Sequence, residues 1–214
     1  GLCRIKVIQM NDGYMTILSN ISSADPTPGG GTVAALTLAH AQSLALMVSR
    51  LTVGKEKWQE GHIISSKIIN SESVFLERSI HLAKADSIAF DKVMESYRMP
   101  KNNDKEKEIR KNAILKSTIG AAKAPFEIAQ EGHKFLLLLP ELAKFGNLNA
   151  ITDLAASAEL AYSAIYIASL NVKINVDSMD DNELDEIQNN TTKIISESEV
   201  LISEIRTIVA RRME

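Results

Sequence analysis

The stretch Asp25-Pro26-Thr27-Pro28-Gly29-Gly30-Gly31-Thr32 gathers two prolines and three glycines in a chain that has only five prolines and ten glycines. An alanine-rich helical pattern follows at once with Val33-Ala34-Ala35-Leu36. Proline fixes φ and lacks a backbone donor, whereas glycine lets a backbone approach a ligand closely. Three glycines that lead into a helix would present free N–H groups to an anion or a carbonyl. Taken alone, the stretch favours a tight turn between helices over a ligand site.

The composition is that of an ordinary globular protein, and we expect one domain over residues 1–214. Hydrophobic residues make up 45% and charged residues 24% of the chain, which is close to the average for soluble domains. The net charge of -3 comes without a basic block, so we expect neither nucleic acid nor a membrane as a partner. A lone cysteine, Cys3, cannot form an internal disulfide, and no signal peptide is visible. We therefore expect the cytoplasm.

Apolar residues recur at helical spacing almost throughout, and only Ile5–Met10 has the look of a strand. We expect a first helix from Asn11 or Asp12 that ends before Asp25. Further helices are expected at Thr32–Leu51, at Trp58–Tyr97 as one helix or a bent pair, from the charged start Lys101–Lys111 through Ala124, at Ala150–Leu170 and at Asp180–Arg211. Pro125 is expected to kink its helix or to begin a new one. The pattern predicts an all-α fold, a single-domain multi-helix bundle with long antiparallel helices, six to nine in number.

The histidines and the lone cysteine do not form a metal-binding pattern. His40, His62, His81 and His133 show no i, i+4 pair, and no cysteine cluster accompanies them. The triple glycine lacks the lysine of a phosphate-binding loop, and no dinucleotide fingerprint follows a strand. We therefore expect no metal and no prosthetic group.

Carboxylates are the better candidates for chemistry. Asp86 and Asp91 lie on one mostly apolar helix, but five residues at about 100° each place them roughly 140° apart, so at most one of them faces a given pocket. Asp153 follows Asn147 and Asn149 near the start of another helix. Those three residues suit either a helix cap or a ligand contact, and the sequence leaves both interpretations open.

Five segments, in order, resemble the formiminotransferase-cyclodeaminase C-terminal family, which also includes stand-alone methenyltetrahydrofolate cyclohydrolases. The first, Asp25 through Ala35, is similar to the family pattern Pro-Thr-Pro-Gly-Gly-Gly-(Ser/Thr)-Val-Ala-Ala. The others are Leu51-Thr52-Val53-Gly54-Lys55, Asp86 through Tyr97-Arg98-Met99-Pro100-Lys101, Gly146-Asn147-Leu148-Asn149-Ala150-Ile151-Thr152-Asp153 and Asn171-Val172-Lys173-Ile174-Asn175. The chain departs from the pattern at His40, Gln42 and Lys123, where we expect smaller or uncharged residues.

The resemblance implies a cytoplasmic, homodimeric folate enzyme that acts on a tetrahydrofolate derivative without a metal. It favours methenyltetrahydrofolate cyclohydrolase, in which water opens the methenyl bridge to give 10-formyltetrahydrofolate. The alternatives are formiminotetrahydrofolate cyclodeaminase, which releases ammonia as the methenyl bridge forms, and a non-catalytic helical-bundle binding protein. Asp153 or Asp86 is the expected catalytic carboxylate. The expected substrate-binding residues are Asp25, Pro28, Gly29, Gly30, Gly31, Thr32, Lys55, Arg98, Asn147, Asn149 and Asn175.

Overall fold

The computed structural model describes residues 12–214, and within that range it is helical without a strand. The predicted all-α class is therefore confirmed, whereas the strand-like stretch Ile5–Met10 lies outside the described residues. The α-helices are α1 (Asp12–Ile21), α2 (Gly30–Thr52), α3 (His62–Asn70), α4 (Glu72–Arg98), α5 (Asp104–Leu136), α6 (Leu139–Phe145), α7 (Ile151–Val176) and α8 (Asn182–Met213). Two short 3-10 helices, Glu56–Gly61 and Leu148–Ala150, join them.

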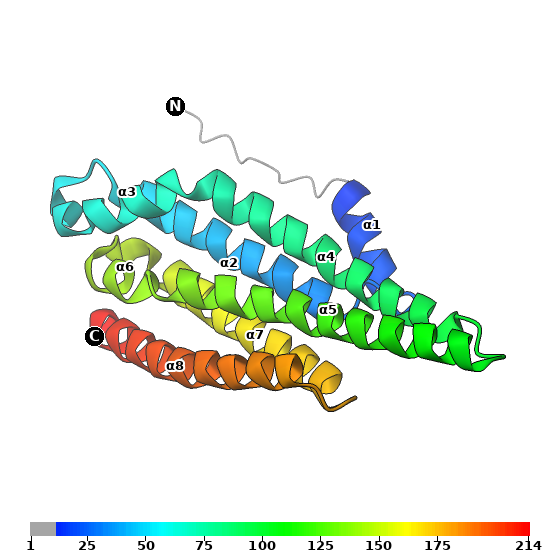
Figure 1. Cartoon of the computed structure of the whole chain (residues 1–214). Coiled ribbons are helices and arrows are strands. Elements are labelled where there is room, and N and C mark those ends of the chain that lie inside the picture. The colour runs from blue at the N-terminus through cyan, green and yellow to red at the C-terminus, as the bar shows by residue number, and fades with distance from the viewer. Residues whose placement is uncertain (1–11) are drawn as a thin grey trace.

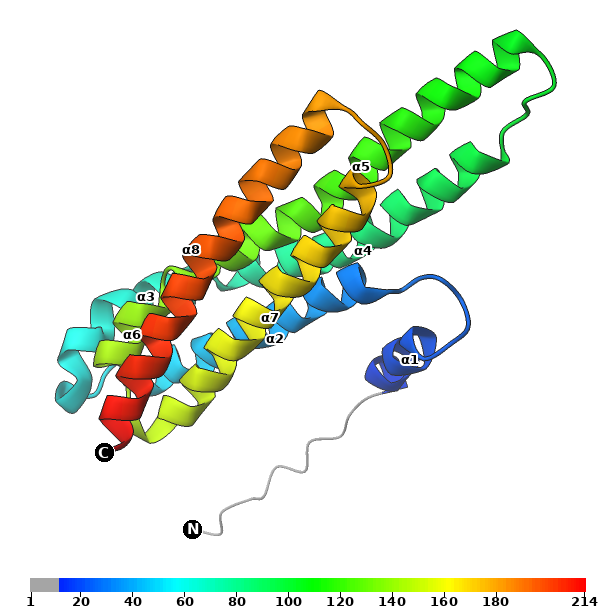
Figure 2. The ribbon, with the colours of Figure 1, turned by 90° about the horizontal axis from the view of Figure 1, so that it is seen from below.

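The long helices lie side by side and alternate in direction, so that their connections gather at two ends of the bundle (Figures 1 and 2). One end, called here the α1 end, holds α1, the start of α2 and the α4–α5 and α7–α8 connections. The other end, the α3 end, holds α3, α6 and the C-terminus. Because α2 has 23 residues and a helix rises about 1.5 Å per residue, the two ends of α2 lie about 33 Å apart.

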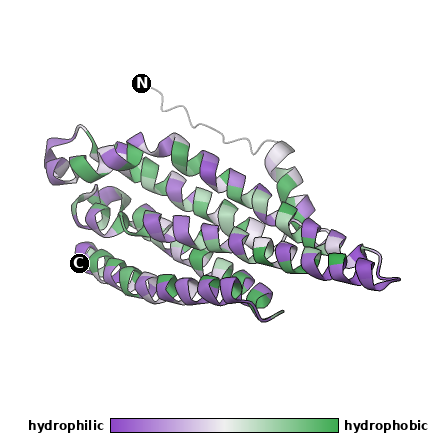
Figure 3. Ribbon diagram, viewed as in Figure 1, coloured by the Kyte–Doolittle hydropathy of each residue, from purple (hydrophilic) through white to green (hydrophobic). Residues whose placement is uncertain are grey.

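Small side chains let α2 lie at the centre of the bundle, in contact with α4 and α7. Ala34, Ala41 and Ala45 of α2 and Ala158 and Ala161 of α7 have no exposed surface. By length and composition α2 could cross a membrane, but many of its apolar residues, Leu38 and Leu46 among them, are buried in this core. Hydrophilic residues dominate α8 and the far ends of α4 and α5 (Figure 3).

The stretch Trp58–Tyr97, expected to form one helix or a bent pair, is interrupted at two points. A 3-10 turn precedes α3, and the helix breaks again at Ser71, whose hydroxyl donates to the Lys67 carbonyl at 3.0 Å. Gly61 is the last residue of the 3-10 turn, and a Cβ at this position would lie 2.5 Å from the Phe145 carbonyl oxygen, which leaves room only for glycine. The α3 end is therefore closed by backbone contact between this turn and α6.

Helix α5 continues through Pro125, where the sequence predicts a kink or a new helix. Proline cannot donate a hydrogen bond to the carbonyl four residues earlier, so the carbonyl of Ala121 lacks its usual partner. The side-chain amide of Asn175 on α7 donates to that carbonyl at 3.1 Å. A proline is thus tolerated inside α5 because a neighbouring helix supplies the missing donor.

Candidate functional site

The predicted glycine-rich stretch forms the start of α2, and a carboxylate from α4 covers it. Gly29 is the N-cap residue and has no side chain to satisfy the first N–H groups of the helix. Asp86 of α4 acts as the acceptor in its place, since the Asp86 carboxylate accepts hydrogen bonds from the side chain and backbone of Thr32. The predicted residues Gly29, Gly31, Thr32 and Asp86 are therefore brought together at the α1 end.

Gly31 is the position that the carboxylate requires to be glycine. A Cβ at residue 31 would overlap the Asp86 carboxylate and lie 2.5 Å from its Cγ. At Gly30 the nearest atom to such a Cβ is Nδ2 of Asn171, at 3.6 Å, which is an ordinary contact. Glycine at residue 31 therefore makes room for Asp86, whereas residue 30 has space for a small side chain.

Thr32 connects Asp86 to a chain of hydroxyl groups. Its Oγ1 lies 3.3 Å from Oδ2 of Asp86 and 2.8 Å from Oγ of Ser87, and also 3.2 Å from the Ala83 carbonyl oxygen. When Ser87 donates to Thr32 and Thr32 donates to Asp86, the three groups form a continuous path for a proton. Ser87 was not predicted from the sequence, because one serine beside an aspartate on a helix carries no recognisable signal.

Burial raises the pKa of Asp86 above its ordinary value. Loss of hydration is the larger effect, and the hydrogen bonds from Thr32 oppose it without cancelling it. A carboxyl whose pKa is moved toward neutrality can accept a proton and return it during one reaction cycle.

An apolar cavity of about 450 Å³ lies beside the Thr32 and Ser87 hydroxyls. It is bounded by α1, α2 and α4, and Pro28, at a cis Thr27–Pro28 peptide bond, forms part of its edge. Its walls include Leu36 and Ile88. The cavity therefore offers an apolar surface for a flat ring, with a hydroxyl pair on one side that leads to a carboxylate.

The predicted binding residue Asn175 lies near this end of α7, but its amide nitrogen is already used. It donates to the Ala121 carbonyl and, at 2.8 Å, to the Asn171 carbonyl. Asn171 donates in turn to the Ile167 carbonyl at 2.9 Å. The structure therefore gives the amide nitrogen of Asn175 a role in holding α5 against α7.

Asn147 and its neighbours lie at the opposite, α3 end. The Asn147 side chain is buried, donates to the Leu51 carbonyl at 2.8 Å and accepts from the Asn149 backbone at 3.0 Å. Its backbone N–H donates to the Thr52 hydroxyl at 2.9 Å. The two bonds to Leu51 and Thr52 tie the last turn of α2 to the segment that leads into α7, about 30 Å from Thr32 along α2. Within one chain, Asn147 and Asp86 do not share a pocket.

Several other predicted residues also lie away from Asp86. Asp153, on the first turn of α7, and Lys55, after the end of α2, belong to the α3 end, as does the exposed Asn149. Arg98 is exposed at the last residue of α4, about 18 Å from Asp86 along that helix. Asp25 is exposed in the loop before α2, where its backbone N–H donates to the Ser23 hydroxyl at 3.2 Å.

The three departures from the family pattern have local structural roles. Gln42 is buried and accepts a hydrogen bond from the Ser79 hydroxyl at 2.9 Å, which joins α2 to α4. Lys123 pairs with Glu183 of α8, and His40 lies beside the Leu36 carbonyl on the exposed side of α2. In residues 12–214, no group of three or more histidine, cysteine or acidic side chains could hold a metal ion.

Comparisons with known proteins agree with this arrangement. The sequence profile of the formiminotransferase-cyclodeaminase family matches residues 14–193. The chain belongs to this family. It is 35% identical over 172 residues to the methenyltetrahydrofolate cyclohydrolase of Methylorubrum extorquens, covering 80% of this chain and 82% of that protein. The mouse formimidoyltransferase-cyclodeaminase is 29% identical over 161 residues, which are 75% of this chain and 30% of the mouse protein.

The fold matches a family member of known structure. The crystal structure of formiminotetrahydrofolate cyclodeaminase from Thermotoga maritima superimposes with a TM-score of 0.75 at 24% identity, over 95% of this chain and 96% of that chain. At that level of identity the match establishes the shared helical fold. The family assignment made from the sequence is confirmed by the profile match over residues 14–193.

Proposed function

We propose that this protein is a methenyltetrahydrofolate cyclohydrolase and that Asp86 is its general base. The observation that carries the proposal is the half-buried Asp86 carboxylate bound to the start of α2 beside an apolar cavity. The similarity to a named cyclohydrolase, which extends over 82% of that protein, favours this reaction over others of the family.

In this mechanism the substrate ring lies in the cavity bounded by Leu36 and Ile88, and the methenyl carbon faces the Ser87 and Thr32 hydroxyls. A water oxygen forms a bond to the methenyl carbon while its proton passes along the two hydroxyls to Asp86. The negative carboxylate also stabilises the cationic carbon before attack. The path needs no new hydrogen bond within the protein, because Ser87, Thr32 and Asp86 are already connected.

The second step breaks the bond between that carbon and N5 of the folate. Asp86 returns its proton to N5 along the same path, and the hydroxyl proton on the carbon leaves to solvent as the formyl C=O forms. The carbon remains on N10, so the product is 10-formyltetrahydrofolate and one proton is released overall. Because the pKa of Asp86 is raised, its carboxylate is a stronger base in the first step than the carboxylate of an exposed aspartate would be.

Replacing Asp86 by Asn tests the proposal. We expect the rate of methenyl absorbance decay to fall about 10²- to 10⁴-fold, since the variant cannot carry the proton. Asp153→Asn is the matched control: it removes the other predicted carboxylate, which lies at the α3 end. Wild-type turnover in Asp86→Asn, or an equal loss in Asp153→Asn, would remove Asp86 as the base.

The alternative reaction is that of a formiminotetrahydrofolate cyclodeaminase, and the named relatives of that activity give it support. There Asp86 would deliver the proton that ammonia takes away as N10 attacks the formimino carbon. Mixing the protein separately with methenyl- and formimino-tetrahydrofolate distinguishes the two. Decay of the methenyl absorbance indicates the hydrolase, growth indicates the deaminase, and no change with either substrate indicates a binding protein.

We further propose that the protein acts in the cytoplasm as a homodimer, an expectation supported by the family resemblance. Light scattering after size exclusion measures the mass directly. A mass of one chain at micromolar concentration would remove the homodimer from the proposal.

A further inference from the structure

We propose that α1 is a lid that closes over a flat ring bound in the cavity beside Thr32, and that Ile17 is the lid residue that covers the ring. The cavity of about 450 Å³ has walls on α1, α2 and α4, and Ile17 and Asn20 are the residues of α1 that line it. This role rests on the proposed function, because the ring beneath the lid is taken to be that of the folate substrate. A lid that closes on bound substrate holds it in position and excludes bulk water from the reacting groups.

Helix α1 stands apart from the rest of the bundle (Figure 2). Within the part of the chain that the structure describes, α1 does not pack along any of the long helices, whereas α2 lies in close contact with both α4 and α7. The loop from α1 to α2 is exposed from Ser22 to Pro26. The hydroxyls of Ser22 and Ser23 donate to the carbonyls of Ser19 and Asn20, at 3.0 and 2.8 Å, so they bond to the end of α1 and not to another helix. The helix can therefore move on this loop while those hydrogen bonds remain intact.

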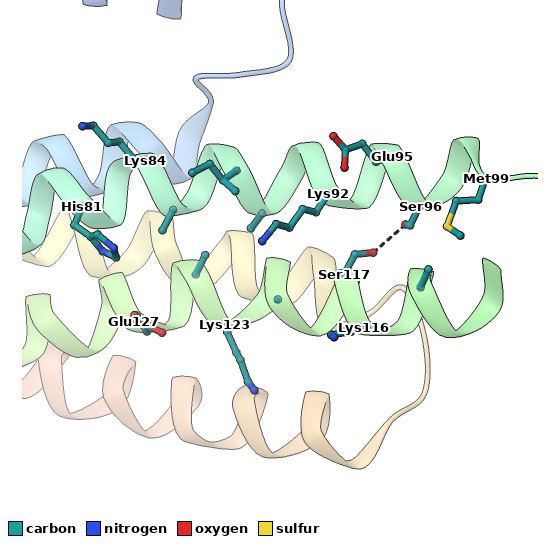
Figure 4. Close-up of a pocket in the computed structure, with 16 residues that line it drawn as sticks. His81, Lys84, Lys92, Glu95, Ser96, Met99, Lys116, Ser117, Lys123 and Glu127 are labelled. Atoms are coloured by element: carbon teal, nitrogen blue, oxygen red, sulfur yellow. Dashed lines mark hydrogen bonds between the residues drawn. The ribbon is translucent and has the colours of Figure 1, made fainter. Parts of the chain in front are cut away.

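The opposite wall of the cavity, α4, is fixed by its contacts with α5. A hydrogen bond of 2.9 Å joins the hydroxyls of Ser96 and Ser117 (Figure 4), and Arg78 of α4 pairs with Glu127 of α5 at 2.6 Å. On its other side α4 meets the cavity, which Lys84 lines, and Lys84 points away from α5 (Figure 4). Because α2 is also held in the core, a change in the width of the cavity must come from movement of α1.

Three isoleucines that line the cavity are only half-covered. Ile17 of α1 is 40% exposed, and Ile80 and Ile88 of α4 are 44% and 53% exposed. A flat ring that lies between α1 and α4 would cover part of all three side chains at once. Closure of α1 onto the ring is therefore favoured by the burial of apolar surface on both faces of the ring.

A contact between Tyr14 and His40, called here the catch, holds α1 over the cavity. The Tyr14 hydroxyl lies 3.4 Å from Nε2 of His40, and the two rings meet edge to face with their centroids 6.2 Å apart. Nδ1 of His40 lies 2.7 Å from the Leu36 carbonyl oxygen, which can only accept, so Nδ1 carries the proton and Nε2 accepts from Tyr14. At 3.4 Å the bond is longer than optimal, so the catch can open. It gives a role to His40, one of the departures from the family pattern.

Ile17→Ala tests the lid by steady-state kinetics, with Met15→Ala as the matched control. Residues 15 and 17 lie about 200° apart around α1, so Met15, which is 55% exposed, points away from the side that carries Ile17. We expect Ile17→Ala to raise KM about tenfold without lowering kcat, because the lost contact covers the ring in the ground state and the transition state alike. Met15→Ala should change neither constant. An unchanged KM in Ile17→Ala, or an equal rise in both variants, contradicts the lid.

Tyr14→Phe and His40→Ala test the catch. Each single variant should raise KM about threefold, and the double variant should raise it by no more than that, because either change removes the same bond. A rise of about ninefold in the double variant would mean that the two residues act separately. That result, or a wild-type KM in all three variants, would overturn the catch.

Hydrogen exchange of the whole chain distinguishes a lid that moves from a rigid wall. The probe is 5-formyltetrahydrofolate, a folate that has no methenyl bridge to open. We expect it to slow amide exchange at least about tenfold in peptides from residues 12–24 and from the start of α2, and to leave peptides from α8 unchanged. Protection at the start of α2 without protection of α1 would overturn the lid and leave the proposed function in place. Absence of protection throughout the chain would contradict the proposed function and the lid together.

Discussion

Replacing Gly31 by Ala should impair the reaction far more than it impairs folding. A Cβ at residue 31 would lie 2.5 Å from Cγ of Asp86, against about 3.4 Å for an ordinary contact, so the carboxylate must move by about 0.9 Å. That movement breaks the 3.3 Å hydrogen bond from Thr32 and interrupts the proton path from Ser87. Because misplacement of a reacting group by about 1 Å costs about 10²-fold in rate, we expect kcat to fall by about that factor.

The effect of Gly31→Ala on stability is smaller because two terms oppose each other. Loss of a hydrogen bond to a charged group costs about 1.5–3 kcal/mol, whereas alanine improves helix propensity by up to about 1 kcal/mol. We therefore expect the free energy of unfolding in urea to fall by about 0.5–2 kcal/mol. Gly30→Ala is the matched control, since its Cβ meets only Nδ2 of Asn171 at 3.6 Å. Wild-type turnover in Gly31→Ala, or the same loss in Gly30→Ala, would refute the reasoning.

Three further predictions concern the residues that the structure places in defined roles. Asn147→Ala removes two side-chain hydrogen bonds at the α3 end and should lower the free energy of unfolding by about 2–4 kcal/mol, with kcat unchanged in the folded fraction. Asn175→Ala should lower the free energy of unfolding by about 1–2 kcal/mol. The loss should be much smaller in a Pro125→Ala background, because alanine at residue 125 gives the Ala121 carbonyl its backbone donor again. Urea denaturation of the wild type, the two single variants and the double variant measures the coupling between residues 125 and 175. Asp86→Asn should become increasingly more stable than the wild type as the pH rises from about 4.

The sign of that last prediction follows from the raised pKa of Asp86. The folded protein retains the proton to a higher pH than the unfolded chain does, so the unfolded chain binds fewer protons between the two pKa values. The free energy of unfolding therefore falls as the pH rises through that window, and stays lower above it. Asparagine carries no charge, so in the Asp86→Asn variant this fall in the free energy of unfolding does not occur. A wild-type stability that rises relative to Asp86→Asn over the same range would contradict the buried carboxylate.

The fold could be predicted well from the sequence because its causes are local. Apolar residues at helical spacing mark α2, α7 and α8, and the prolines and glycines around Gly29 mark the start of α2. What escaped prediction depends on a contact with another helix. Pro125 kinks or ends a helix in isolation, and only Asn175, 50 residues later, makes a continuous α5 acceptable. No period or spacing in the sequence relates those two residues.

The candidate site was predicted only in part, for a reason that the geometry of α2 makes plain. The family segments lie in order along the chain, but each falls near a helix terminus, and an antiparallel bundle sends successive termini to opposite ends. Gly31 and Thr52 are therefore about 32 Å apart although one helix holds both. At the α1 end the side chain and backbone of Thr32 donate hydrogen bonds to Asp86, an ionisable group whose pKa is raised by burial. At the α3 end the corresponding acceptors are satisfied by Asn147, an uncharged amide with no proton to exchange. Of these two residues only Asp86 is ionisable, and its place beside the first N–H groups of α2 explains why an acceptor is found at the α1 end, where we propose that the reaction takes place.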